Sequence, residues 1–119
     1  MSAAVIGQGE IAYGKSSVSG TIKKFTTPDD VLDVIDADLD ETIALVESGG
    51  TTFLGPILGR LGGLICTSGT LRSHLAIVSR EFQLPCLMAV DLKEELDDGV
   101  RVTLVLEGGS GQGTVEREG

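Results

Sequence analysis

The middle of the chain alternates continuous apolar runs with stretches that have the apolar spacing of helices. The apolar runs predict strands buried on both faces, and they are 42–46, 64–67 and 86–90. After Thr51-Thr52, apolar residues recur at three- and four-residue steps as far as Leu61, which predicts a helix. A second helix is predicted from Ser73 to Phe82, because Leu75, Val78 and Phe82 form one stripe. Two successive β-α units predict parallel strand pairing with right-handed crossovers.

The flanks of this region carry shorter signals. In residues 3–25, glycines divide short β-like runs, which predicts short strands joined by glycine turns. The remaining predicted elements are a short helix over 29–35, a helical turn over 92–96, a turn at Asp98-Gly99, and strands over 100–106 and 114–116. The glycine-rich stretch 108–113 opens no helix, so we interpret it as a flexible hairpin turn and not a nucleotide loop.

Length and charge limit the classes of function. The chain has 119 residues, so we expect one domain over 1–119, a stand-alone module with no room for separate nucleotide and substrate folds. Its formal charge of −9 argues against nucleic acid and anionic membranes as partners. No apolar stretch reaches membrane-spanning length and the first residues lack a basic start, so we expect a cytoplasmic protein.

The cysteines and the acidic segment give no metal or disulfide signal. Cys66 and Cys86 lie in apolar, strand-like contexts without a Cys/His ligand set, and we interpret them as buried free thiols in a reducing compartment. The acidic segment 33–41 lacks the glycine and the distal glutamate of a calcium loop. We interpret it as a solvated face or loop.

The only histidine of the chain, His74, lies at the start of the predicted helix 73–82. Small residues precede it, namely Ser68, Gly69, Thr70 and Ser73. Glycine lets backbone amides approach a ligand, and the first helical amides lack intrahelical partners, so this turn predicts an anion cradle. An imidazole there could accept and pass on a phosphoryl group, although a cap or surface role is the commoner fate of such a histidine.

Residues 69–82, followed by Leu84-Pro85, resemble the phosphohistidine signature of the mobile domain of PEP-utilising enzymes. Members of that family include pyruvate phosphate dikinase, phosphoenolpyruvate synthase, enzyme I of the sugar phosphotransferase system and the mobile part of phenylphosphate synthase. Flanking segments are similar in the same order, so the resemblance covers roughly residues 15–117, and these segments are 18–22, 43–46, 51–64 and 96–102. It implies an α/β fold, a swivelling β/β/α phosphohistidine domain with a β-rich layer, parallel β-α units and short helices.

The same resemblance implies roles for individual residues. His74 is the implied phosphoryl carrier, Gly69 and Ser73 belong to the implied phosphate cradle, and Arg80 is the motif arginine, a structural or docking residue. Two positions depart from the family pattern. Thr70 replaces a glycine, and Arg72 stands where the family has threonine. Arg72 either clamps the phosphate by a charge-assisted contact or marks a variant with a different substrate or without phosphotransfer.

In a chain of this length, the resemblance favours a carrier subunit that is inactive without partner chains, because nothing in the sequence would bind ATP or a carboxylated substrate unaided. We expect a nucleotide-binding partner of the ATP-grasp type, a partner that binds PEP, pyruvate or another acceptor, or both. No tightly bound cofactor or metal is implied, only transient phosphate on the histidine, with Mg and ATP on the partner. One alternative is a non-catalytic binding or regulatory subunit in which His74 caps a helix, and another is the small subunit of an aconitase-like dehydratase.

Overall fold

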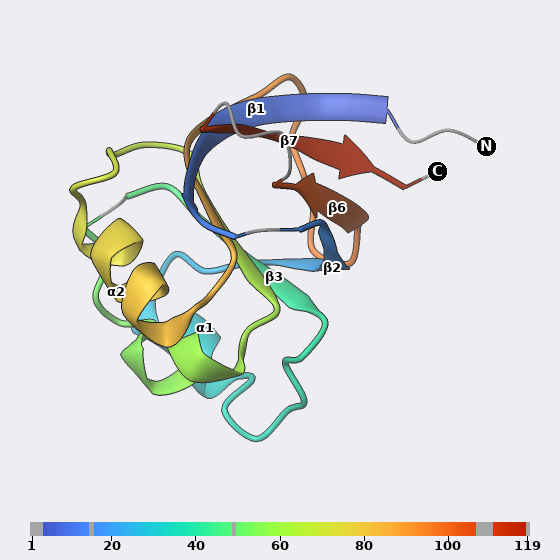
Figure 1. The fold of residues 1–119 in the computed structure, drawn as a ribbon. Helices are drawn as coiled ribbons and strands as arrows, with labels where there is room; N and C mark the ends of the chain where they lie inside the picture. Colours follow the sequence, from blue (N-terminus) through green and yellow to red (C-terminus); the bar gives the residue numbers. More distant parts are fainter. Residues whose placement is uncertain (1–3, 15, 49, 107–110, 119) are drawn as a thin grey trace.

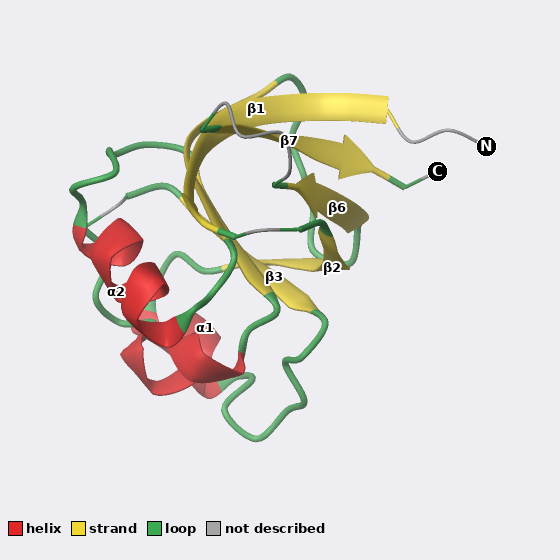
Figure 2. Ribbon diagram, in the orientation of Figure 1, coloured by secondary structure: helices red, strands yellow, loops and turns green. Residues whose placement is uncertain are grey.

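A computed structural model describes residues 4–14, 16–48, 50–106 and 111–118, and their strands close into a barrel (Figures 1 and 2). The order of the strands around the barrel is β1-β5-β4-β3-β2-β6-β7. In chain order the elements are β1 (Ala4–Tyr13), β2 (Val18–Lys24), α1 (Pro28–Leu32), β3 (Thr42–Val46), the 3-10 helix η1 (Gly55–Arg60), β4 (Gly63–Cys66), α2 (His74–Phe82), β5 (Cys86–Leu92), β6 (Arg101–Val105) and β7 (Gln112–Arg117). The predicted β-rich domain with short helices is confirmed, but its sheet is a closed barrel and not a layer.

Pairing directions divide the barrel into two parts. Strands β2, β3, β4 and β5 pair in parallel, whereas β1, β6 and β7 make antiparallel pairs. The helices lie together on one side of the barrel, away from both ends of the chain (Figure 1). Because the four parallel strands run the same way, the loops after their carboxyl ends leave from one edge, including the loop that leads to α2.

Two apolar clusters explain the continuous apolar runs of the parallel strands. In β3, Ile43 and Leu45 face the barrel interior, while Ala44 and Val46 face the helices. β4 repeats the pattern, because Ile65 belongs to the interior cluster and Leu64 to the helix-side cluster. Since successive side chains of a strand point to opposite faces, a strand between two cores needs apolar residues at every position.

The amino-terminal region differs from the predicted series of short strands. β1 is a single ten-residue strand that runs through Gly7 and Gly9. A Cβ at Gly9 would lie 2.7 Å from the Met88 carbonyl oxygen, so glycine there allows close approach of β5 and does not form a turn. Beside it, Ala89 adopts φ +53° where the β1–β5 register shifts. Of the glycines near this strand, Gly14 directly follows its end and has a positive φ, +140°.

Three local predictions were wrong or too long. Instead of a helix through Leu61, the structure has the short 3-10 helix η1, whose sequence contains Gly55, Pro56 and Gly59 and favours an α-helix poorly. Residues 92–96 form no helical turn, because β5 continues to Leu92 and a bend follows. In α2 the predicted stripe is shifted, since Leu75, Ala76 and Ser79 are buried and Phe82 is 53% exposed.

The helix predicted over 29–35 is confirmed in shortened form as α1. The Asp30 carboxylate accepts the backbone N–H groups of Thr26 and Thr27 at 2.7 and 3.0 Å, which holds the start of the helix. These hydrogen bonds lower the pKa of Asp30 below its ordinary value. The Asp98-Gly99 turn and strands β6 and β7 are found near their predicted positions, whereas residues 107–110, which include part of the predicted glycine-rich hairpin, lie outside the described residues.

The two cysteines are free and buried, as predicted. Burial raises the pKa of the Cys66 thiol, and burial raises the pKa of Cys86 to about 12. Both thiols therefore stay protonated near neutral pH, which makes them poor nucleophiles. Across the described ranges, the structure has no helix with both the length and the apolar character needed to cross a membrane.

Candidate functional site

The loop between β4 and α2 gathers the residues that the sequence singled out. Residues 67–73 leave the carboxyl end of β4 and lead directly into the first turn of α2. Ser68, Gly69, Thr70 and Arg72 are exposed, and Ser73 is half-buried. His74, the first residue of α2, is also exposed. The loop thus presents small polar residues and one imidazole to solvent.

The hydroxyl groups of Thr70 and Ser73 accept hydrogen bonds from the backbone of the loop. The Thr70 amide donates to Ser73 Oγ at 2.8 Å, and the Arg72 amide donates to Thr70 Oγ1 at 3.1 Å. The Ser73 amide donates to the Thr70 carbonyl at 3.0 Å, which completes a tight turn. Since each hydroxyl oxygen serves as acceptor, its proton remains able to donate to a bound anion.

The start of α2 offers further donors. Ser73 is the N-cap residue, but its side chain makes no capping hydrogen bond to the helix. The structure shows an acceptor for the Ile77 amide, the Ser73 carbonyl, but within the described residues it shows none for the amides of His74, Leu75 and Ala76. These are the amides that a helix leaves unpaired, and the helix dipole adds positive potential there. The arrangement can stabilise negative charge next to the imidazole.

Gly69 gives the loop its shape. Its φ of +101° lies in the region that residues with a Cβ adopt only with strain. The predicted glycine of the cradle therefore has a conformational reason to be glycine. Its place after Ser68 sets the direction in which the chain turns toward Thr70 and Ser73.

The carrier role that the family resemblance implies for His74 predicts that Gly69→Ala slows its labelling by phosphoramidate, a small phosphoryl donor, about tenfold. A φ of this kind costs an alanine about 1–3 kcal/mol, and relaxation would move the loop. Gly99→Ala is the matched control, since Gly99 has φ +94° with open space around it and lies in a turn between other elements. Urea titrations should show a similar decrease in the free energy of unfolding for both variants. Only Gly69→Ala should be labelled more slowly than the wild type. Equal labelling rates for the two variants would contradict this expectation.

The two arginines of the motif region have different surroundings. Arg72 is exposed, and in the described part of the chain its side chain has no hydrogen bond or ion pair. Arg80, two turns into α2, donates from Nη2 to the Leu71 carbonyl at 2.8 Å and from Nε to the Ala12 carbonyl at 3.2 Å. Arg72 is therefore available to meet a ligand, whereas Arg80 is committed to the backbone on either side of it.

Two anchors of the loop were not found by sequence analysis. The Ser68 hydroxyl donates to the carbonyl of Glu47, which follows β3, and Arg80 reaches the Leu71 carbonyl nine residues earlier. In both anchors a side chain donates to a backbone carbonyl that is distant in sequence. Because every residue type has a backbone carbonyl, no sequence pattern predicts which one accepts the hydrogen bond. The only signal for Arg80 was its place in the motif.

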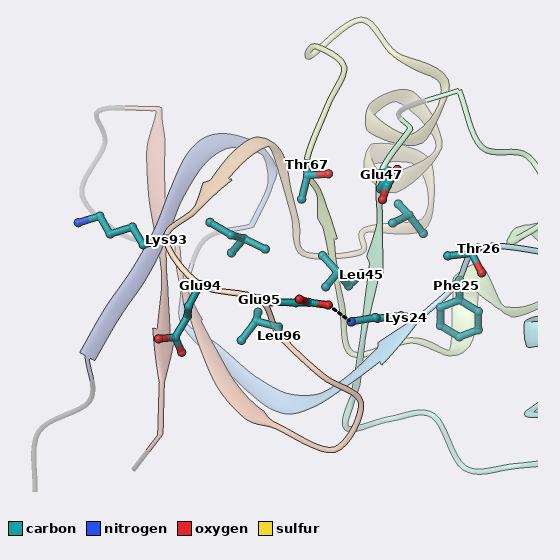
Figure 3. Close-up of a pocket in the computed structure, with 12 residues that line it drawn as sticks. Lys24, Phe25, Thr26, Leu45, Glu47, Thr67, Lys93, Glu94, Glu95 and Leu96 are labelled. Atoms are coloured by element: carbon teal, nitrogen blue, oxygen red, sulfur yellow. Dashed lines mark hydrogen bonds and ion pairs between the residues drawn. The ribbon is translucent and has the colours of Figure 1, made fainter.

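A pocket of about 490 Å³ lies at the carboxyl-end edge of the parallel strands, and His74 is not among the residues that line it (Figure 3). Its apolar wall includes Phe25, Leu45 and Leu96. An ion pair crosses it, with Lys24 Nζ 3.3 Å from the Glu95 carboxylate. Thr67, the first residue of the histidine loop, lines the pocket as well, so the pocket and the loop are neighbours along the chain.

Metal chemistry finds no support in the described residues. Among them, no three His, Cys, Asp or Glu side chains come together in a way that could hold a metal ion. The acidic residues Asp38, Asp40 and Glu41 line a shallow pocket with Thr21 and Thr42, where all three acids are exposed. The donors at the histidine loop are amides, hydroxyls and the Arg72 guanidinium, a set suited to an oxyanion.

Fold and site together define a small barrel domain that presents one exposed histidine at the start of a helix, beside hydrogen-bond donors suited to an oxyanion. A family model for the mobile domain of PEP-utilising enzymes matches residues 39–111, more than half of the chain, and the matched region contains the whole histidine loop and α2. The protein belongs to this family. A search of curated proteins found no match.

Proposed function

We propose that the protein is a phosphoryl-carrier subunit of a multi-subunit phosphotransferase, with His74 as the carrier. The unprotonated imidazole nitrogen attacks a phosphorus of ATP or phosphoenolpyruvate with its lone pair, and the bond to the leaving oxygen breaks with its electrons going to that oxygen. The proton on the other ring nitrogen is released to solvent. In the second transfer the acceptor attacks that phosphorus and loses its proton, the N–P bond breaks with its electrons returning to the ring nitrogen, and the other ring nitrogen regains a proton. Membership of the family supports the carrier role. The proposal assigns the donor and the acceptor to partner chains.

One observation carries this proposal. The only histidine of the chain is exposed as the first residue of α2, next to amides with no acceptor in the described structure. These amides, the hydroxyl protons of Thr70 and Ser73, and the Arg72 guanidinium can surround the three phosphoryl oxygens. Charge-assisted hydrogen bonds of this kind are stronger than those between neutral groups. The loop is therefore suited to stabilise a phosphoryl group on the ring.

Phosphoramidate, a small chemical donor, tests the carrier role without any partner. The imidazole attacks its phosphorus, the P–N bond to ammonia breaks, and ammonia leaves. We expect acid-labile, base-stable phosphate on His74 of the folded protein, formed faster than on N-acetylhistidine at the same concentration because the loop holds the incoming group. Mass spectrometry of the intact chain and its peptides would locate the phosphate. Labelling no faster than that of the free amino acid, or phosphate at another residue, would overturn the proposal.

Arg72→Gln is expected to slow this labelling about fivefold, because it removes a charge-assisted contact worth about 1 kcal/mol to the incoming phosphoryl group. The matched control is Lys93→Gln, which removes another exposed positive charge at the end of β5, outside the loop. The rate of phosphoramidate labelling, measured at equal ionic strength, compares the two. Equal rates for both variants would show that Arg72 does not clamp the phosphate.

The partners are proposed from the family to which the domain belongs. The described structure offers a histidine loop and one neighbouring pocket, and the family's carrier works between two sites. We therefore propose a nucleotide-binding chain of the ATP-grasp type, a chain that binds PEP, pyruvate or another acceptor, or both. Proteins that co-purify with the chain test this. A nucleotide-binding chain would indicate ATP as donor, and a PEP- or pyruvate-binding barrel would indicate phosphoenolpyruvate or pyruvate chemistry. Absence of both kinds of chain would contradict the carrier role.

A further inference from the structure

Arg80 holds one peptide unit of the histidine loop from a position two turns into α2. Its Nη2 donates to the Leu71 carbonyl at 2.8 Å, and that carbonyl shares a planar peptide with the Arg72 amide. The Arg72 amide donates in turn to Thr70 Oγ1 at 3.1 Å. Both polar groups of the 71–72 peptide are therefore satisfied, and its plane has a single orientation.

That orientation matters for an anion. A peptide carbonyl carries partial negative charge, and a free carbonyl beside the imidazole would repel phosphoryl oxygens. The hydrogen bond from Arg80, a residue of α2, holds the Leu71 carbonyl toward that arginine. The residues that follow Leu71 in the chain are Arg72, Ser73 and His74, so a rotation of this peptide would move three of the residues proposed to meet the phosphate.

The second hydrogen bond of Arg80 ties the loop to the barrel. Nε donates to the carbonyl of Ala12 at 3.2 Å, and Ala12 lies in β1, which pairs with both β5 and β7. The planar guanidinium fixes the two donors in one geometry, which a lysine ammonium cannot reproduce. The Arg80 side chain thus connects the 71–72 peptide of the loop to strand β1 of the barrel.

We propose that Arg80 is a positioning residue for His74, which it serves by fixing the 71–72 peptide against β1. The inference rests on the proposed carrier function. In this view Arg80 acts through the backbone, because the hydrogen bonds shown for its guanidinium in the described structure both go to backbone carbonyls, from Nε and from Nη2. Its effect on phosphorylation passes through the Leu71 carbonyl and the Arg72 amide.

Arg60 provides a matched control within the same chain. Its guanidinium also donates to two backbone carbonyls, to that of Ile35 at 2.6 Å and to that of Ala37. Those carbonyls belong to the segment between α1 and β3, away from the histidine loop in sequence. Arg60→Gln and Arg80→Gln therefore each remove a guanidinium that donates to two backbone carbonyls. Only the guanidinium of Arg80 contacts the histidine loop.

The test compares phosphoramidate labelling rates and Tm for the wild type, Arg80→Gln, Arg80→Lys and Arg60→Gln. We expect Arg80→Gln to slow labelling of His74 about tenfold or more. Arg80→Lys should recover part of the rate, because one donor can still reach Leu71. Arg60→Gln should lower Tm by a similar amount with labelling unchanged. A wild-type rate in Arg80→Gln, or an equal slowing in Arg60→Gln, would overturn the inference.

Amide hydrogen exchange separates this inference from the proposed function. The Arg72 amide is protected by its bond to Thr70 Oγ1, and Arg80→Gln should speed its exchange while Arg60→Gln leaves it unchanged. If wild-type His74 takes up no phosphate, the carrier function fails, and faster exchange in Arg80→Gln alone would still support the brace. Unchanged exchange of the Arg72 amide in Arg80→Gln would overturn the positioning role whatever the labelling shows.

Discussion

Replacement of His74 with asparagine is expected to abolish acid-labile phosphorylation of the chain and leave its fold intact. The chain has no second histidine, so no other imidazole can take the phosphoryl group. The side chain is exposed and makes no hydrogen bond to the described part of the protein, so its removal should change the unfolding free energy by no more than about 0.5 kcal/mol. Labelling with phosphoramidate and urea titration measure the two quantities.

The same variant decides between a carrier and a binding subunit. A carrier loses transfer to the acceptor with His74→Asn and keeps its affinity for partner chains. If the chain is a non-catalytic subunit, in which the histidine only begins a helix, the variant changes neither the transfer to the acceptor by the whole complex nor the affinity for partner chains. Acid-labile phosphate that persists in the variant would show that another group is modified, which contradicts the assignment of His74. Arg60→Gln serves as a control for a general loss of stability, because it removes hydrogen bonds to Ile35 and Ala37 and leaves the sequence of the histidine loop unchanged.

Gly9→Ala is expected to destabilise the barrel by about 2–3 kcal/mol, the usual cost of forcing atoms into a filled space. A Cβ at Gly9 would lie 2.7 Å from the Met88 carbonyl oxygen and 2.7 Å from a Val90 methyl group. The carbonyl belongs to the backbone of β5, where Ala89 already has φ +53°, so the strand cannot move away without disturbing its pairing with β1. Urea unfolding measures the change.

Gly55→Ala is the control for this prediction. A Cβ added at Gly55 would have nothing within 4 Å, and the residue is exposed at the start of η1. Its replacement should change the unfolding free energy by no more than about 0.5 kcal/mol. If Gly9→Ala has the stability of the wild type, the prediction is contradicted. The result would show that β1 and β5 can move apart enough to accommodate a Cβ at this position.

Local signals predicted the elements around the site. The helix from Ser73 to Phe82 follows from apolar spacing and the proline at 85, and the structure begins it at His74 with Ser73 as N-cap. The run 42–46 was found as β3 with its predicted bounds. These signals work because spacing and proline act within a few residues, where the chain alone sets the conformation.

Other features depended on partners that are distant in sequence. Phe82 was expected on the buried stripe, but its ring lies near Gly59 of η1 and the residue stays half exposed. Gly7 and Gly9 suggested turns, since sequence cannot distinguish a glycine that bends the chain from one that admits a neighbouring strand. The anchoring of Leu71 by Arg80 carried no local signal either.

The sequence by itself determined that an imidazole follows a Gly/Thr/Ser turn at the start of a helix, and that the strands around it are apolar on both faces. Those are properties of neighbouring residues and of side-chain type. Only the tertiary structure decided that the sheet closes into a barrel and that Arg80, Glu47 and β1 hold the loop. Such contacts involve backbone carbonyls far apart in the chain, and folding alone brings them together.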